Sequence, residues 1–187
     1  MINRKTFFDG IRSGPFPGKL TKPQVEGVNV LLDEYERHYA NLLLSELAYI
    51  LATTKWETAH TMQPIPEIGR GKGRRYGKPD PETGQIYYGR GYVQLTWKRN
   101  YQAMEQSTNL DLVNQPDLAL QPKAAAEILF AGMILGIFTG KKLANYFGPD
   151  RTDFFNARKI VNGLDKAQEI ANIAKMFYAD LLLAQES

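Results

Sequence analysis

The feature that most constrains this chain is one long interruption in an otherwise helical sequence. Residues 60–88 contain four prolines and five glycines, and no helical or strand period survives across them. An irregular segment of this length between ordered regions is typical of functional loops. We therefore expect helices on both sides of it and, within it, an irregular or β-containing insert beside a cleft, with a small hairpin near residues 82–85.

The flanking sequences predict the helices. Thr21, Lys22, Pro23 and Gln24 have the pattern of a capping box with proline in the first turn, and apolar residues follow at helical spacing. A second helix, apolar nearly all round and so largely buried, is expected from Asn41 to about Glu57. Beyond the insert we expect helices near residues 100–107, 122–138, 143–147, 153–161 and 165–184.

Size and composition favour one mainly α (α+β) domain over residues 1–187, with two lobes. The chain is 43% hydrophobic and contains no cysteine, so packing alone must hold the fold. The first eleven residues lack the apolar core of a signal peptide. The longest uncharged apolar run, 128–138, is too short to span a bilayer, so we expect a core helix there and no membrane insertion.

Charged and metal-binding patterns are less specific. The net charge of +3 suits an anionic polymer but is too small to indicate nucleic acid. Residues 70–78 carry five cations, which fits a solvated loop, a cleft rim that touches an anionic wall, or a nucleic-acid patch; we do not expect nucleic acid. The two histidines, His38 and His60, are too isolated for a metal site.

Glu57 is a candidate general acid. It ends the second predicted helix beside Trp56, at the mouth of the irregular insert, where a carboxyl group is partly shielded from water. Glycoside hydrolysis needs a second carboxyl group to activate water. Glu67, Asp80 and Glu82 all follow in the insert, and the residue pattern alone does not rank them.

Residues 87–97 form the most unusual stretch, with the sequence YYGRGYVQLTW. Polar Gln94 and Thr96 alternate with apolar Val93 and Leu95, which predicts a short strand with the polar pair on one face. Aromatic rings with amide and hydroxyl groups are typical of sugar-binding sites. A tight turn before a half-buried strand explains the same pattern without any ligand.

Together with Trp56-Glu57-Thr58, this stretch resembles the glycoside hydrolase family 19 chitinases, in particular their phage and prophage endolysin branch, which has a lysozyme-like fold. Further matching segments lie at residues 111–120, 131–133, 138–140 and 157–163. The resemblance implies that Glu57 is the acid, Glu67 the base, and Thr96 the residue that positions water. It also implies that Gln94 and Asn100 line the sugar cleft and that Asn162 lies on its opposite wall. Tyr88 and Arg90 of the aromatic stretch are further candidates for binding the substrate. The arginine that supports the site in plant members has no clear counterpart, and Lys175 is the nearest cation.

The resemblance implies hydrolysis of β-1,4 bonds in peptidoglycan by an endolysin, without a metal or other cofactor. We expect a monomer that stays in the bacterial cytoplasm until it is released to the cell wall. Chitin is the alternative substrate. A third hypothesis is a non-catalytic wall-binding module, against which the presence of Glu57 argues.

Overall fold

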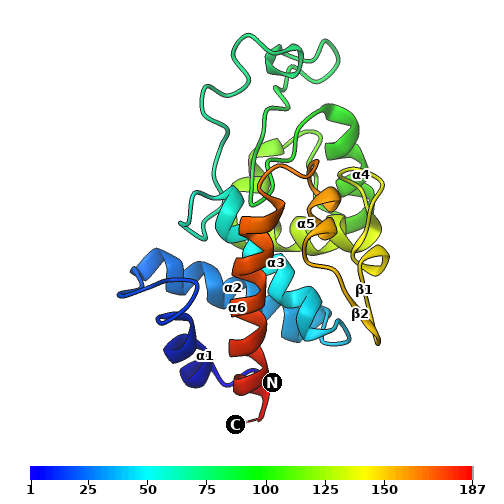
Figure 1. The fold of residues 1–187 in the computed structure, drawn as a ribbon. Coiled ribbons are helices and arrows are strands. Elements are labelled where there is room, and N and C mark those ends of the chain that lie inside the picture. The colour runs from blue at the N-terminus through cyan, green and yellow to red at the C-terminus, as the bar shows by residue number, and fades with distance from the viewer. Residues whose placement is uncertain (187) are drawn as a thin grey trace.

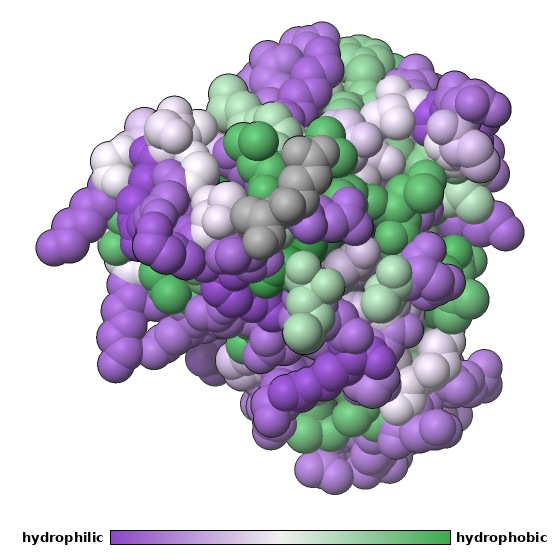
Figure 2. Space-filling model, turned by 90° about the horizontal axis from the view of Figure 1, so that it is seen from below, coloured by the Kyte–Doolittle hydropathy of each residue, from purple (hydrophilic) through white to green (hydrophobic). Residues whose placement is uncertain are grey.

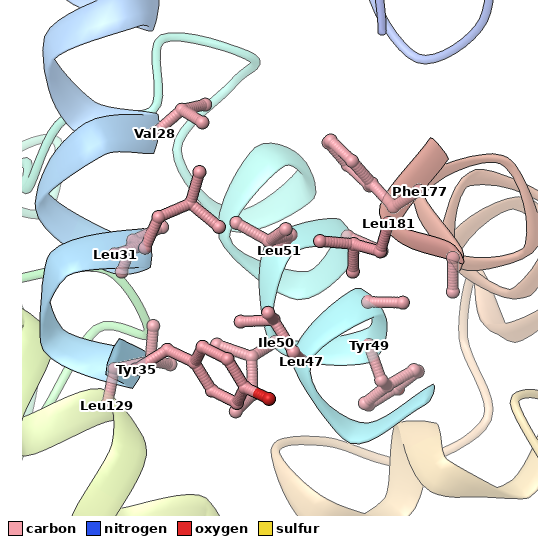
Figure 3. Packing of buried hydrophobic residues seen from close by; sticks show 14 of the residues in the cluster. Val28, Leu31, Tyr35, Leu47, Tyr49, Ile50, Leu51, Leu129, Phe177 and Leu181 are labelled. Atoms are coloured by element: carbon pink, nitrogen blue, oxygen red, sulfur yellow. The ribbon is translucent and has the colours of Figure 1, made fainter. Parts of the chain in front are cut away.

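Helix α3 (Leu44–Glu57) lies at the centre of the fold in the computed structural model, which describes residues 1–186. It is packed between α2 (Lys22–His38) and α6 (Ala167–Glu186). Figure 3 shows Leu31 of α2 and Leu181 of α6 on opposite sides of Leu51. Every residue from Ser45 to Lys55 is buried, which explains why α3 is apolar nearly all round.

The remaining elements surround this core (Figure 1). Helix α1 (Arg4–Ile11) packs on α6, and α5 (Pro122–Leu135) packs on both α2 and α4 (Lys98–Thr108). Strands β1 (Phe147–Gly148) and β2 (Arg151–Thr152) form a small antiparallel sheet. Short 3-10 helices occur at η1 (Arg75–Gly77), η2 (Pro116–Leu120), η3 (Leu143–Asn145) and η4 (Asn156–Ile160).

The expectation of a mainly helical chain is confirmed. The capping box of α2 is present, because Gln24 donates its backbone N–H to the Thr21 hydroxyl and accepts one from the Thr21 backbone. Helix α3 begins three residues later than expected. The helices predicted near 143–147 and 153–161 are short 3-10 turns, and α1 has no counterpart in the prediction.

Buried side chains form two hydrophobic clusters, and α5 contributes to both. The larger cluster joins α1, α2, α3, α5 and α6 and includes Leu129 and Phe130. The smaller one lies around α4 and includes Tyr87, Leu95, Ile128 and Ala131, whereas Tyr92 and Val93 of the 87–95 stretch belong to the larger cluster. Opposite faces of one helix therefore hold the two clusters together.

The segment between α3 and α4 extends from the helical body as a long excursion, drawn in teal and green at the top of Figure 1. The predicted hairpin near residues 82–85 is only a turn, in which Asp80 and Gly84 are joined by a backbone hydrogen bond of 2.8 Å. The paired strands of the described residues lie instead at 147–152. Proline and glycine favour turns over ladder pairing in this segment.

The end of the molecule where both termini lie has a mixed surface, with hydrophobic residues in separate patches among hydrophilic ones (Figure 2). Within residues 1–186, no helix combines the length and the apolar character that crossing a bilayer requires.

Candidate active site

Glu57 leaves the core at the last position of α3, and its side chain is 18% exposed. The turn that follows is fixed by Thr58, whose hydroxyl donates to the carbonyl of Thr54 (2.7 Å) and accepts the N–H of Met62 (3.0 Å). Met62 has a φ of 57°, an uncommon backbone conformation for a residue with a side chain. The turn therefore sets where Glu57 points.

Gly27 of α2 makes room for this turn. A Cβ atom at Gly27 would lie 1.8 Å from the carbonyl oxygen of Met62, so any side chain would push the two segments apart. Gln24 donates to the carbonyl of His60 (2.9 Å), and Gln63 donates to that of Pro23 (2.6 Å). The start of α2 thus holds the segment that follows Glu57.

The partner of Glu57 is Arg158 in η4, a residue that was not among the predicted site residues. The Nη1 of Arg158 donates to Oε1 of Glu57, and its Nε donates to the carbonyl of Asp165 (3.0 Å). The Arg158 side chain is only 4% exposed. The expectation that Lys175 is the nearest cation is wrong, because Arg158 pairs with Glu57 directly. Lys175 lies exposed on α6.

Glu67 is held by both of its oxygens. The backbone N–H of Gly89 donates to Oε2 (3.1 Å), and the hydroxyl of Tyr76 donates to Oε1 (2.7 Å). The backbone of Glu67 also pairs with the Gly89 carbonyl (2.7 Å). A Cβ atom at Gly89 would lie 3.3 Å from Cβ of Glu67 and 2.8 Å from Oε1 of Gln94. Because Gly89 has no side chain, the side chains of Glu67 and Gln94 can both pack against its backbone.

The other two candidate bases, Asp80 and Glu82, are both paired with Lys98. Oδ1 of Asp80 also accepts the backbone N–H groups of Glu82 (3.1 Å) and Thr83 (3.0 Å). The hydrogen bond from Lys98 is the main reason that the pKa of Asp80 is lowered to about 2. These contacts give Asp80 a clear structural role at the turn, and Glu82 is 79% exposed.

Gln94 and Thr96 do not lie on a regular strand. Gln94 has a φ of 57°, and only Leu95 forms a bridge, with Arg90. The predicted strand is therefore wrong, and a tight hairpin takes its place. Gln94 donates to the carbonyl of Ile65 (3.0 Å). The half-buried Thr96 uses its carbonyl to accept the Asn100 amide (2.9 Å), and its hydroxyl bonds to no other group within residues 1–186.

Arg90 and Tyr88, expected to bind sugar, lie inside the protein. The Arg90 side chain is 4% exposed, pairs with Asp117 (2.7 Å) and stacks 3.5 Å from the centre of the Tyr88 ring. It also donates to Tyr101 (3.1 Å). This expectation is corrected: burial prevents Arg90 from reaching a substrate, and it instead supports the hairpin next to Glu67.

Asn162 lies exposed just after η4. Its backbone N–H donates to the carbonyl of Arg158 (3.0 Å), and its Oδ1 accepts the N–H of Gly163 (2.8 Å). Asn162 therefore belongs to the same turn as the partner of Glu57.

An aromatic hollow of about 190 Å³ has in its wall Tyr76, whose hydroxyl donates to Glu67. Its walls include Tyr76 and Trp97, whose rings meet edge to face with centroids 5.2 Å apart. Trp97 is 42% exposed, so part of its surface is open to a ligand. No sequence pattern marks Tyr76, because only the folded loop brings its hydroxyl to Glu67. Residues 1–186 contain no group of three or more histidine, cysteine or acidic side chains placed to hold a metal.

Comparison with known proteins gives matches of limited length in sequence. A family model described as chitinase class I, glycoside hydrolase family 19, matches residues 72–136. Chitinase 3 of Oryza sativa is 35% identical over 88 residues, which are 39% of this chain and 28% of the relative. An endochitinase of Arabidopsis thaliana is 34% identical over 126 residues, or 64% of this chain and 43% of the relative. The chain thus spans less than half the length of these curated relatives.

Comparison with solved structures covers nearly all of the chain. Chitinase C from Streptomyces griseus gives a TM-score of 0.55 at 21% identity, over 98% of this chain and 76% of that one. A class IV family 19 chitinase from Zea mays gives 0.55 at 17% identity, over 95% and 91%. The expected lysozyme-like fold is confirmed. The structural matches show the fold, and the sequence matches show that part of this chain, including residues 72–136, is similar to glycoside hydrolase family 19, the class I chitinases.

Proposed function

We propose that this protein is a glycoside hydrolase that cleaves β-1,4 bonds between amino sugars, with Glu57 as general acid and Glu67 as general base. The observation that carries the proposal is the way the two carboxyl groups are held. Glu57 is fixed by a buried arginine, and Glu67 is fixed by a backbone N–H and a tyrosine hydroxyl. Glu57 Oε2 has no partner within residues 1–186, which leaves it available to a substrate.

The chemistry then follows from the two roles. Glu57 donates a proton to the glycosidic oxygen as its bond to the sugar breaks. Glu67 removes a proton from water as that water attacks the anomeric carbon. The Thr96 hydroxyl, which bonds to no other described group, positions the water. Gln94, Asn100 and Asn162 are proposed to bind the sugars, and Trp97 offers a ring face for stacking.

Chitin-type polymers of N-acetylglucosamine are the substrate class that the comparisons favour, because the similar proteins are named chitinases and endochitinases. Peptidoglycan is the second candidate. The basic charge of the chain, with a pI of about 9.0, and the resemblance to endolysins support it. Incubation with chitin oligomers and, separately, with purified sacculi distinguishes the two by which polymer releases soluble sugars.

The test of the mechanism is Glu57→Gln, which removes the proton donor but keeps the shape. We expect turnover to fall by about 100-fold or more, since general acid–base catalysis typically contributes factors of about 10² to 10⁴. The matched control is Glu82→Gln, which neutralises an exposed carboxylate of the same segment and should keep activity. Unchanged turnover in Glu57→Gln would exclude Glu57 from the mechanism. No turnover by the unmodified protein on either polymer would favour a wall-binding module.

A further inference from the structure

The loop of residues 69–78, called here the cationic loop, carries a concentrated positive charge beside Glu67. Its five cations are all exposed, and it contains no acidic residue; they are Arg70, Lys72, Arg74, Arg75 and Lys78. None of them forms an ion pair within residues 1–186. Since the net charge of the whole chain is only +3, the rest of the protein is net acidic, and the excess positive charge belongs to this loop.

The loop is closed on itself by two glycines. A Cβ atom at Gly77 would lie 1.8 Å from the carbonyl oxygen of Gly71, so no other residue fits this contact. Arg74 bridges them, donating its N–H to Gly71 (2.8 Å) and accepting that of Gly77 (3.2 Å). Like charges repel, so clustering five cations costs free energy that an anionic ligand would offset. A loop already closed also loses less entropy when it binds.

The cationic loop is joined to the candidate base at both ends. The N–H of Arg70 donates to the carbonyl of Glu67 (3.0 Å), and the hydroxyl of Tyr76 donates to its side chain (2.7 Å). Arg75 and Lys78 line the aromatic hollow together with Tyr76 and Trp97. Any polymer that reaches Glu67 through this hollow therefore passes the loop.

We propose that the cationic loop binds carboxylate groups carried by the polymer that is cleaved, and hence that the natural substrate is an acidic amino-sugar polymer of the peptidoglycan class. This inference rests on the proposed function and names its substrate class. Neutral chitin offers no charge to compensate the loop. Carboxylates on side groups of the glycan would compensate this charge, because Arg and Lys form strong charge-assisted hydrogen bonds with carboxylates.

The experiment measures binding separately from hydrolysis, in the Glu57→Gln background. Arg70→Gln, Lys72→Gln and Arg74→Gln are combined, because these side chains do not line the hollow. The control combines Lys141→Gln, Lys142→Gln and Lys175→Gln, which removes the same charge from exposed lysines elsewhere. Thermal unfolding first checks that each variant has the same Tm as its parent. Cosedimentation with purified sacculi, with chitin beads and with bead-bound single-stranded RNA is then compared across salt concentrations.

We expect the loop variant to bind sacculi about tenfold more weakly than its parent at about 0.1 M salt, since each exposed ionic contact contributes up to about 1 kcal/mol. The difference should vanish at about 1 M salt, where the Debye length falls from about 10 Å to about 3 Å. Binding to chitin beads and binding by the control variant should hardly change. An equal loss in the control, or no loss in the loop variant, would overturn the inference, as would tighter loop-dependent binding to RNA than to sacculi.

The two proposals fail in different ways. If Glu57→Gln leaves turnover intact while the loop variant still loses binding to sacculi, only the assignment of the acid falls. If turnover needs Glu57 but the loop variant binds sacculi like its parent, only the inference about the cationic loop falls.

Discussion

At the scale of single residues, the contact between Arg158 and Glu57 is the interaction that distinguishes this site. A guanidinium that is 4% exposed is costly to bury alone, and the carboxylate that it contacts is 18% exposed. Removing one partner leaves the other charge buried without compensation. The pair therefore links the stability of the fold to the position of the proposed acid.

Arg158→Ala should lower the free energy of unfolding by about 3 kcal/mol, because it leaves Glu57 buried without its partner. The same change in the Glu57→Gln background should cost clearly less, since no charge is then left unpaired. Urea unfolding of the four proteins of this double-mutant cycle gives a coupling energy, expected at about 1–3 kcal/mol. If the two substitutions are additive, the contact does not stabilise the folded protein.

The residues that the sequence predicted well are those whose neighbours in the chain define them. Glu57 is recognisable because it ends a buried helix before an irregular segment, and the structure places it there. Arg158 was missed because it lies 101 positions from Glu57, and no local pattern reports a contact of that range. Arg90 was misplaced because a glycine-flanked arginine in a loop gives no sign of whether it is buried.

At the scale of elements, the turn at residues 80–85 is held by several hydrogen bonds within the insert and to α4. Asp80 accepts two backbone N–H groups of this turn and the Lys98 ammonium at the start of α4. One carboxylate thus fixes both the turn and its attachment to the next helix. Its proposed role is structural, which leaves Glu67 as the candidate base.

Asp80→Asn should destabilise the protein at neutral pH but keep turnover, whereas Glu67→Gln should lose turnover. The pKa of Asp80 is about 2 in the folded protein, below its ordinary value of 3.8, mainly because of the hydrogen bond from Lys98. The ionised carboxylate therefore stabilises the fold above about pH 4, and this contribution disappears as the pH falls through about 2. The Tm of the unmodified protein and that of Asp80→Asn, measured by thermal unfolding from pH 7 to pH 2, should converge as the pH falls. A difference that stays constant over this range would contradict the assignment.

Elements with a periodic sequence were predicted better than those made by tertiary contacts. The capping box of α2 appeared as expected, because its four residues carry all the needed donors and acceptors. The strand expected at residues 93–96 did not form, since Gln94 adopts a φ of 57° that breaks the alternation. Its side chain is instead directed by the Ile65 carbonyl, which lies 29 positions earlier in the chain. Alternation of polar and apolar residues cannot reveal such a turn.

At the scale of the whole molecule, α5 and the 87–95 stretch both join the two hydrophobic clusters, so we expect the clusters to unfold together. Leu129 is fully buried in the larger cluster, and its chain neighbour Ile128 is buried in the smaller one. The catalytic proposal depends on this arrangement, because Glu57 extends from the larger cluster, while the stretch that holds Glu67 contributes Tyr92 and Val93 to the larger cluster and Tyr87 and Leu95 to the smaller one. A shared helix would keep the two carboxyl groups in a fixed relation.

Leu129→Ala and Ile128→Ala should each lower the Tm of one common unfolding transition, although the two substitutions leave cavities in different clusters. Truncating a buried leucine or isoleucine costs about 2–5 kcal/mol, and each kcal/mol lowers Tm by about 2–4 °C in a chain of this size. Calorimetry tests this directly, because a cooperative unit gives equal calorimetric and van't Hoff enthalpies. Trp56→Phe, which leaves Trp97 as the fluorescent reporter beside the hollow, should report the same Tm for Leu129→Ala as circular dichroism does. Two resolved transitions, or a Trp97 signal that is unmoved by Leu129→Ala, would mean that the clusters unfold separately and that the carboxyl groups are not held by one rigid frame.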